Sequence, residues 1–403
     1  MLYLDHNATS PPRPEAIEES LRAARDFFAN PSSQHAPGRK ARAFLEECRE
    51  RVAARLGVHA TEIVFTSGGT ESNRLAIEGA LGSRGGDGPP PLALAFDLEH
   101  PSVLEPLCRL RDEGRIRLES IRSSSGGDFL AGELVDALKR GPRLVTIQHA
   151  NSETGVIQRL MDARAAIERA VHPSFESPIF HADMAQSLGR VRCRPAELGP
   201  DLVTFSAHKL GGPRGTGALW ARRGVPFASI LRGGPQERGL RAGTEDLPAI
   251  AGFAKALEIA STELEGAADP DARGIDLGTL LGDLLARRVE GASLNGDRSR
   301  VLPNTVNVSF EGVSADLLVI ELDRRGVAVS TGSACASGSR EPSRVLRAMH
   351  LPETRVRSAI RLSTGWTTTR KDVEEAVEVV RSAVETLRAA ERSLSRSGGE
   401  RVA

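Results

Sequence analysis

The stretch LVTFSAHKLGGP, residues 202–213, decides the fold, because an apolar run of strand length leads straight into a lysine and a pair of glycines. Residues 202–205 predict a buried strand, and Lys209 then lies in the loop at its carboxyl end. Parallel α/β sheets bind ligands at that edge, and glycines let the backbone approach a ligand closely. Lys209 is therefore a candidate Schiff-base lysine, while the loop taken alone also fits a surface lysine in a turn.

Four other short apolar runs have the same character, and helix-length amphipathic stretches separate most of them. These runs are residues 62–66, 92–96, 144–147 and 178–182. Such alternation of strands and helices predicts a mainly parallel α/β sheet.

The later part of the chain changes character. Residues 252–286 follow a helical pattern, and residues 304–310 alternate like a strand with one exposed face. Residues 369–387 predict an amphipathic helix, and Thr369 and Asp372 have the spacing of a capping box at its start. These elements predict a second, smaller α+β domain.

The composition argues against several classes of partner. The 403 residues contain 53 Lys and Arg against 53 Asp and Glu, so the chain lacks the basic bias that nucleic acid or an anionic membrane selects. No apolar run approaches the ~20 residues of a membrane span, and the N-terminus has no signal-peptide pattern. The cysteines and histidines show neither a C-x-x-C pair nor metal-ligand spacing. We expect a soluble cytoplasmic protein without a metal site.

Polar residues that suit a cofactor follow the other predicted strands. Asp183 comes just after a strand, where a carboxylate keeps a pyridinium nitrogen protonated, and Gln186 follows it closely. His100 is placed to stack on an aromatic ring and to pass protons near neutral pH, and Asn151 offers an amide donor. Taken singly, Asp183 also fits a helix cap and His100 a structural histidine.

The stretch TSGGTES, residues 66–72, lies between a predicted strand and a helix. Backbone N–H groups and a hydroxyl at a helix N-terminus form an anion site that suits phosphate. Gly69 and Thr70 are its central residues, and no lysine follows the glycines as in a nucleoside-triphosphate loop. In isolation the stretch also fits an ordinary threonine N-cap.

The stretch STGSACASGS, residues 330–339, has almost no bulky side chain to bury, so we expect an exposed loop. An exposed thiol is prone to oxidation, which favours a nucleophile or sulfur carrier at Cys335 over a core residue. The other cysteines lie in helical or Arg-rich settings and are predicted to be structural: Cys48, Cys108 and Cys193.

Together these motifs resemble a cysteine desulfurase of the NifS/IscS type, in the class-V aminotransferase branch of the fold-type-I pyridoxal-phosphate enzymes. Further stretches that carry the resemblance are YLDHNAT at 3–9, NPSSQH at 30–35, NSETG at 151–155 and RGLRAGTE at 238–245. The resemblance implies a large domain, residues 16–255, with a mainly parallel seven-stranded sheet. It also implies a small α+β domain, residues 1–15 and 256–403, that carries the Cys335 loop.

The resemblance implies a role for each matching residue. Lys209 would hold the cofactor as a Schiff base, Asp183 would pair with its pyridine nitrogen, and His100 would stack on its ring. Arg361 would clamp the substrate carboxylate, because its planar two-donor group suits that task. Thr244 would reach the phosphate of a neighbouring subunit, which implies a homodimer. The full set of implied cofactor contacts is Lys209, Gly69, Thr70, His100, Asn151, Asp183, Gln186, Ser206, His208 and Thr244.

Within that set, Gln186 would contact the ring hydroxyl, while Thr70, Ser206 and His208 would bind the phosphate. Asn151 would also assist in binding the substrate carboxylate.

The implied reaction converts L-cysteine to L-alanine. Lys209 would take the α-proton, and the Cys335 thiolate would attack the substrate sulfur and keep it as a persulfide for an acceptor protein. His100 is a candidate proton donor or acceptor. A selenocysteine lyase or a cystine β-lyase would share the Lys209 apparatus, and an inactive sulfur-relay scaffold is the non-enzyme alternative.

Two residues depart from the family pattern. Arg74 stands where many relatives have Asn or Asp, and Arg340 puts a charge where relatives often have an apolar residue. The second departure bears on which acceptor docks. The sequence leaves the destination of the sulfur open among iron–sulfur cluster assembly, tRNA thiolation, DNA modification and biosynthesis.

Overall fold

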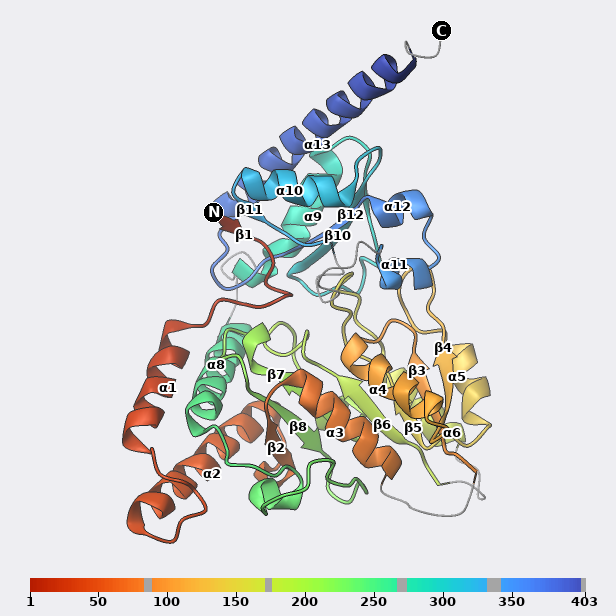
Figure 1. Cartoon of the computed structure of the whole chain (residues 1–403). Helices are drawn as coiled ribbons and strands as arrows, with labels where there is room; N and C mark the ends of the chain where they lie inside the picture. Colours follow the sequence, from red (N-terminus) through yellow and green to blue (C-terminus); the bar gives the residue numbers. More distant parts are fainter. Residues whose placement is uncertain (83–88, 171–175, 267–273, 332–341, 400–403) are drawn as a thin grey trace.

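The computed structural model describes residues 1–82, 89–170, 176–266, 274–331 and 342–399. Figure 1 shows these residues in two parts, one above the other. The lower part contains a large sheet with helices around it. The upper part contains two small sheets, and the C-terminal helix α13 (Arg370–Gly399) extends away from it.

The large sheet has seven strands in the order β2-β8-β7-β6-β5-β3-β4. Its neighbours from β7 to β4 are all parallel, and β8 alone pairs antiparallel, with β7 on one side and β2 on the other. The mainly parallel α/β fold is therefore confirmed. In chain order the strands are β2 (Ile63–Thr66), β3 (Leu92–Phe96), β4 (Arg117–Ile121), β5 (Leu144–Thr146), β6 (Ile179–Asp183), β7 (Leu202–Ser206) and β8 (Gly217–Ala221).

Helices bury both faces of this sheet. In β3, Leu94 and Phe96 belong to one apolar core, whereas Ala93 and Ala95 face a second one. Burial on both faces explains why the parallel strands are nearly continuous apolar runs in the sequence. The helices of the lower part are α1 (Pro14–Asp26), α2 (Ala36–Leu56), α3 (Gly69–Gly82), α4 (Pro101–Asp112), α5 (Ala131–Leu138), α6 (Leu160–Ala170), α7 (Pro195–Leu198) and α8 (Leu247–Gly266), with 3-10 turns η1 (Ala60–Glu62), η2 (Ala207–Lys209) and η3 (Gln236–Gly239).

The upper part has a core of its own. Residues of β10, α9, α10 and α13 form it together with Leu4 from the N-terminal segment. Strand β10 (Thr305–Phe310) lies between β12 (Ala359–Ser363) and β9 (Ala292–Leu294), both antiparallel to it, while β1 (Leu2–Tyr3) pairs with β11 (Val327–Ala328). The helices here, besides α13, are η5 (Gly274–Leu277), α9 (Gly278–Arg288), α10 (Ala315–Arg324), α11 (Arg344–Ala348) and α12 (Glu353–Arg357).

The domain division stays a prediction. The predicted boundary between residues 255 and 256 falls inside α8, whose Ala256, Leu257 and Ala260 belong to a core of the lower part. No helix among the described residues is both long and apolar enough to cross a bilayer.

Two details of the sequence analysis need correction or completion. Strand β10 has no exposed face, because all six of its residues are buried. Its polar side meets polar groups of the N-terminal segment and of the lower part: Thr305 Oγ1 accepts from Asn7 Nδ2 at 3.0 Å, and Asn307 Nδ2 donates to the Glu153 carbonyl at 3.3 Å. The predicted capping box is confirmed, since Thr369 N donates to Asp372 Oδ2 at 2.8 Å and Asp372 N to Thr369 Oγ1 at 3.2 Å.

Candidate active site

Lys209 lies in η2, directly after β7, and its amine already has partners in the N-terminal segment. Nζ donates to the carbonyl oxygens of Asn7 at 2.6 Å and Ala8 at 2.9 Å. The chain turns sharply behind it at Gly211, where φ is +89° and a Cβ would lie 2.8 Å from Arg13 Cγ. Only glycine meets both conditions without strain, so this turn sets the position of the lysine.

Asp183 ends β6, the strand next to β7, and its carboxylate is held on both oxygens. Oδ2 accepts from Asn73 Nδ2 at 2.8 Å, and Oδ1 accepts from the Ala185 backbone N–H at 2.9 Å. Asn73 Nδ2 also donates to Ser102 Oγ at 2.8 Å, which links Asp183 to the start of α4. The parallel topology thus brings Lys209 and Asp183 to the same edge of the sheet, as the sequence predicted.

His100 is the N-cap of α4, and its hydrogen bonds fix its neutral tautomer. The Ser102 backbone N–H donates to His100 Nδ1 at 3.1 Å, and Ser102 Oγ lies 2.7 Å from the same nitrogen. A backbone N–H can only donate, so Nδ1 is the acceptor. In the neutral imidazole the proton is therefore on Nε2, which leaves that nitrogen as the donor toward a ligand.

Among the residues predicted to bind phosphate, Gly69 and Thr70 begin α3, and Ser206 lies beside Gly69. A Cβ placed on Gly69 would lie 3.5 Å from the Ser206 Cβ, and Thr70 beside it is exposed at the helix N-terminus. His208 Nδ1 lies 3.0 Å from Thr9 Oγ1. Burial, with smaller effects from nearby cations, lowers the pKa of His208 to about 4, so this ring is neutral at pH 7. Thr244 is exposed, on the loop between η3 and α8.

Gln186 and the buried Arg190 form hydrogen bonds close to Lys209. Gln186 Nε2 donates to the Asn7 carbonyl at 3.1 Å, the same oxygen that Lys209 contacts. Arg190 NH1 donates to Gln186 Oε1 at 2.5 Å, and its NH2 donates to the carbonyls of His6 at 3.2 Å and Lys209 at 3.3 Å. These partners are neutral oxygens, so the guanidinium leaves a buried positive charge close to the site.

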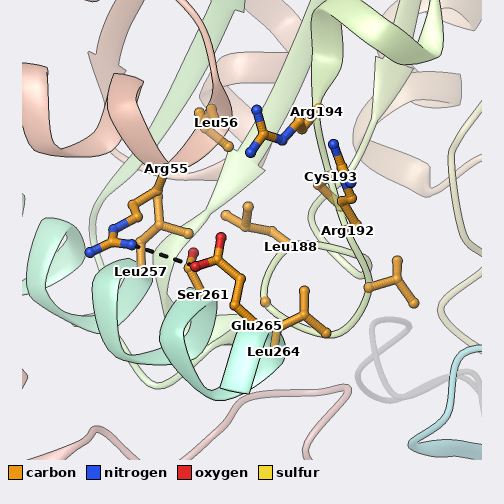
Figure 2. Close-up of a pocket in the computed structure, with 12 residues that line it drawn as sticks. Arg55, Leu56, Leu188, Arg192, Cys193, Arg194, Leu257, Ser261, Leu264 and Glu265 are labelled. Atoms are coloured by element: carbon orange, nitrogen blue, oxygen red, sulfur yellow. Dashed lines mark ion pairs between the residues drawn. The ribbon is translucent and has the colours of Figure 1, made fainter. Parts of the chain in front are cut away.

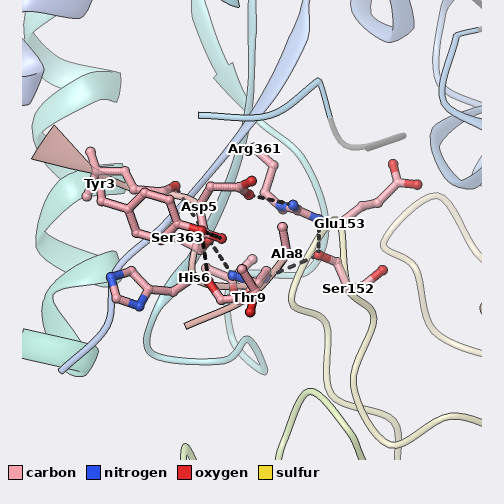
Figure 3. A network of polar contacts seen from close by, with 12 residues as sticks. Tyr3, Asp5, His6, Ala8, Thr9, Ser152, Glu153, Arg361 and Ser363 are labelled. Atoms are coloured by element: carbon pink, nitrogen blue, oxygen red, sulfur yellow. Dashed lines mark hydrogen bonds and ion pairs between the residues drawn. The ribbon is translucent and has the colours of Figure 1, made fainter. Parts of the chain in front are cut away.

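Arg361 projects from β12 toward Asp5 and Ser152 (Figure 3). NH1 donates to the Ser152 carbonyl at 3.0 Å and NH2 to Asp5 Oδ1 at 2.7 Å. Asn151 is buried beside it, with Oδ1 accepting from the backbone N–H groups of Glu153 and Thr154 at 2.9 Å. Its oxygen therefore shapes the turn, while its Nδ2 donates one N–H to the Leu98 carbonyl at 3.2 Å and has a second N–H for a ligand.

Several residues of the site were not predicted. Asp5 and Asn7 lie in the N-terminal stretch that the resemblance included, but they were given no role. Asn73 lies on the same helical face as Thr70, which is a usable signal. Arg190 gives no such signal, because besides Gln186 it contacts the carbonyls of His6 and Lys209, which are distant in the sequence.

Among the cysteines, Cys335 lies outside the described residues. Cys48 and Cys193 are buried, and burial raises the pKa of each thiol to about 12, as expected of structural cysteines. Cys193 borders a hollow of about 270 Å³ between the ends of α2 and α8 (Figure 2). Arg55 and Glu265 line that hollow, with Arg55 NH1 4.0 Å from Glu265 Oε2. None of the predicted site residues that the structure describes lines it.

The donors and charges of the site fit pyridoxal 5′-phosphate. A primary amine lies at one strand end, and a fixed carboxylate lies at the next. A helix N-terminus with hydroxyl groups and a neutral imidazole suits a phosphate. The buried charge of Arg190 also favours an anionic ligand.

Comparisons with known proteins agree with this arrangement. Residues 2–376 match the family described as Aminotransferase class-V. The chain is 38% identical to cysteine desulfurase IscS of Dictyoglomus turgidum over 395 residues, which cover 96% of this chain and 95% of that protein. It is also similar to the solved structure of a NifS-like protein, with a TM-score of 0.87, 30% identity and coverage of 96% of this chain and 100% of the other.

A third similarity concerns a structure described as SspA in complex with cysteine, with a TM-score of 0.78 and 29% identity. It covers 92% of this chain and 100% of the other. These matches extend over nearly the whole length of the chain, and the candidate site lies within the matched residues. The chain therefore belongs to the class-V aminotransferase family.

Proposed function

We propose that the protein is a pyridoxal 5′-phosphate-dependent cysteine desulfurase. It converts L-cysteine to L-alanine and passes the sulfur to Cys335 as a persulfide, and then to an acceptor protein. The observation that carries the proposal is the pair of Lys209 and Asp183 at adjacent strand ends, within a chain whose relatives bear the name cysteine desulfurase.

Each residue around the cofactor has a defined task. Lys209 is its covalent anchor, and Asp183 pairs with the ring nitrogen. His100 stacks on the ring and presents Nε2–H. Gly69, Thr70, Ser206 and His208 would hold the phosphate, and Gln186 would contact the ring hydroxyl. When bound, the cofactor supplies an electron sink that stabilises negative charge at the substrate α-carbon.

The protein's own side chains carry the remaining steps. Arg361 binds the substrate carboxylate through its planar fork, with Asn151 beside it. Lys209 receives the α-proton and returns a proton to the carbon that loses sulfur. The Cys335 thiolate attacks the substrate sulfur and the C–S bond breaks. L-Cysteine and the Cys335 thiol thus become L-alanine and the Cys335 persulfide, with all atoms accounted for.

Two variants test the proposal. Cys335→Ala should abolish sulfide release from L-cysteine but leave the visible absorbance of the bound cofactor intact. Lys209→Ala should lose that absorbance. The matched controls are Cys108→Ala and Lys139→Ala, which should retain both properties. Full sulfide release by Cys335→Ala would overturn the assignment and favour a cystine β-lyase or selenocysteine lyase, and absence of absorbance in the parent protein would favour a scaffold.

We further propose a cytoplasmic homodimer in which Thr244 of one copy completes the phosphate site of the other. Sedimentation of the purified protein should therefore give twice the mass of the chain. Capture of proteins by the persulfidated form should identify the sulfur acceptor. Our first expectation for this acceptor is a scaffold for iron–sulfur cluster assembly.

A further inference from the structure

Two consecutive residues in the loop between β8 and α8 have a left-handed backbone although neither is glycine. Glu237 has φ 46° and Arg238 has φ 59°, both within η3. In this region the side chain of an L-residue crowds its own backbone. Such strain persists only where surrounding contacts over-determine it, so the contacts of Glu237 are informative about the purpose of the loop.

Glu237 forms a fully buried ion pair with Arg49 of α2. The two carboxylate oxygens accept from Arg49 NH1 and NH2, each at 2.7 Å, and the side chains are only 1% and 2% exposed. The backbone N–H of Phe65 in β2 also donates to the carboxylate, at 2.8 Å. The Arg49 guanidinium covers the Phe65 ring at 4.8 Å. One carboxylate therefore joins the loop, α2 and β2.

Strand β2 leads directly into the turn of residues 66–70, which carries Gly69 and Thr70. The same loop contacts the far side of that turn through Arg241, whose Nε donates to Glu71 Oε1 at 2.9 Å. Glu71 in turn accepts from the Ser67 backbone N–H at 2.6 Å. The loop thus holds the turn from both ends. Glu237 contacts β2 before the turn, and Arg241 contacts α3 after it.

The loop is also closed on itself, one residue before Thr244. The Gly243 backbone N–H donates to Gln236 Oε1 at 3.1 Å, and Thr244 follows as an exposed residue. The contacts that fix the turn of residues 66–70 therefore also fix the stem from which Thr244 projects.

We propose that Glu237 is a positioning residue for the phosphate end of the cofactor site. With Arg49 it holds the loop of residues 236–244 and the turn of residues 66–70 in one arrangement. A single buried ion pair thereby orders the phosphate donors of this copy and the Thr244 that serves a second copy. The inference rests on the proposed function, because it takes the turn of residues 66–70 to be a phosphate site.

Binding of two cofactor forms to the apoprotein tests this role without any turnover. Absorbance titration gives the affinity for pyridoxal 5′-phosphate and for pyridoxal, which has the same ring without the phosphate. Glu237→Gln keeps the side-chain size but removes the buried counter-charge of Arg49, which then retains only the half-exposed Glu46, at 3.0 Å from its Nε. We expect affinity for the phosphate form to fall by about 10-fold or more, and affinity for pyridoxal to stay within about 3-fold.

A matched control is Glu258→Gln, which breaks the two-point ion pair between Arg51 and Glu258, at 2.7 and 2.8 Å, away from the site. It should leave both affinities unchanged. Should Glu237→Gln fail to fold, Arg241→Gln tests the second contact, since the Arg241–Glu71 pair is partly exposed. Its loss should be smaller, about 3-fold, and again confined to the phosphate form.

The outcomes separate the two proposals. Equal losses of affinity for the two cofactor forms would overturn the positioning role, and so would an unchanged affinity for the phosphate form in the folded variants. Either result would leave the proposed function standing. Failure of the parent protein to bind pyridoxal 5′-phosphate at all would overturn the proposed function, and the positioning role with it.

Discussion

Arg361 NH2 donates to Asp5 Oδ1 at 2.7 Å, so the arginine expected to bind the substrate is already held by the N-terminal segment. Its NH1 donates to the Ser152 carbonyl at 3.0 Å, and the side chain is 4% exposed. The fork is therefore oriented before a substrate arrives. Preorganised donors bind a carboxylate at a lower entropic cost than free ones.

This arrangement predicts that lysine cannot replace Arg361. Lysine retains the charge but has no planar fork, and it cannot contact Asp5, Ser152 and a carboxylate with the same geometry. A charge-assisted hydrogen bond contributes about 1.5–3 kcal/mol, so Arg361→Lys should raise KM for L-cysteine by about 10- to 100-fold. Alanine formation at varied cysteine concentration measures this. Arg357→Lys, at an exposed position of α12, is the control, and an unchanged KM in Arg361→Lys would exclude the substrate role.

The Asn73–Asp183 contact predicts a graded loss of turnover. Asp183→Asn removes the charge that we propose to pair with the ring nitrogen of the cofactor, so kcat should fall by about 100-fold or more while the cofactor stays bound. Asn73→Ala leaves the charge but frees the carboxylate from its 2.8 Å donor, so a fall of about 10-fold is expected. Single-turnover alanine formation checks both. Asp136→Asn, on the exposed face of α5, should behave as the parent protein, and equal losses in the Asp183 and Asn73 variants would contradict this ranking.

In the large sheet, the sequence predicted five strands that are buried on both faces and missed β4 and β8. β2, β3, β5, β6 and β7 were placed to within about one residue at each end, because both faces of these strands need apolar residues. Strand β4 lies at the edge of the sheet and has exposed and half-exposed residues, so it has no apolar run. Strand β8 begins at Gly217, at the end of a stretch rich in glycine, which breaks the apolar pattern.

The candidate site was predictable where local sequence determines position. Lys209, Asp183 and His100 each follow a strand, and parallel strands bring their carboxyl ends to one edge. Asn7 and Arg190 were not predicted, because tertiary contacts define their roles. Asn7, for example, contacts Lys209, Gln186 and Thr305, none of which is near it in the sequence. The buried polar face of β10 was not predicted for the same reason, since Asn7 and Glu153, which contact Thr305 and Asn307, are far away in the sequence.

Gly155 predicts a large difference between two glycine substitutions. It has φ +76°, and a Cβ there would lie 2.8 Å from Thr305 Cβ and 2.9 Å from Val301 Cγ2, where the lower part meets β10. Gly155→Ala should therefore lower the free energy of unfolding by about 1–3 kcal/mol or more.

The control for Gly155→Ala is Gly132→Ala, in the exposed first turn of α5, where no atom lies within 4 Å of the added Cβ. Alanine has the better helix propensity, so this change should be neutral or stabilise by up to about 1 kcal/mol. Urea unfolding of the two variants tests the pair. Similar free energies of unfolding in both variants would show that the turn at Gly155 relaxes freely.

Buried histidines make the protein sensitive to acid. Burial lowers the pKa of each of three rings from 6.5 to about 4: His6, His149 and His181. Between these two values the unfolded chain binds more protons than the folded one, so stability falls as the pH drops from about 6.5 toward 4. The buried carboxyl groups of Glu99 and Glu153 act in the opposite direction, because burial raises their pKa. Variants must therefore be compared with the parent protein at each pH.

His181 gives the sharpest test, because its ring lies between two strands with Nδ1 2.9 Å from Thr146 Oγ1 and Nε2 3.2 Å from Thr204 Oγ1. His181→Gln can keep one donor and one acceptor but has no proton to gain in this pH range. It should destabilise the protein at pH 7.5, yet lose less stability than the parent on going to pH 5, by an amount on the order of 1–2 kcal/mol. Urea unfolding at the two pH values measures the difference. His59→Gln, at an exposed position, should leave the pH dependence as it is. A parental pH dependence in His181→Gln would mean that the buried ring takes up its proton without unfolding, and that acid sensitivity originates elsewhere in the chain.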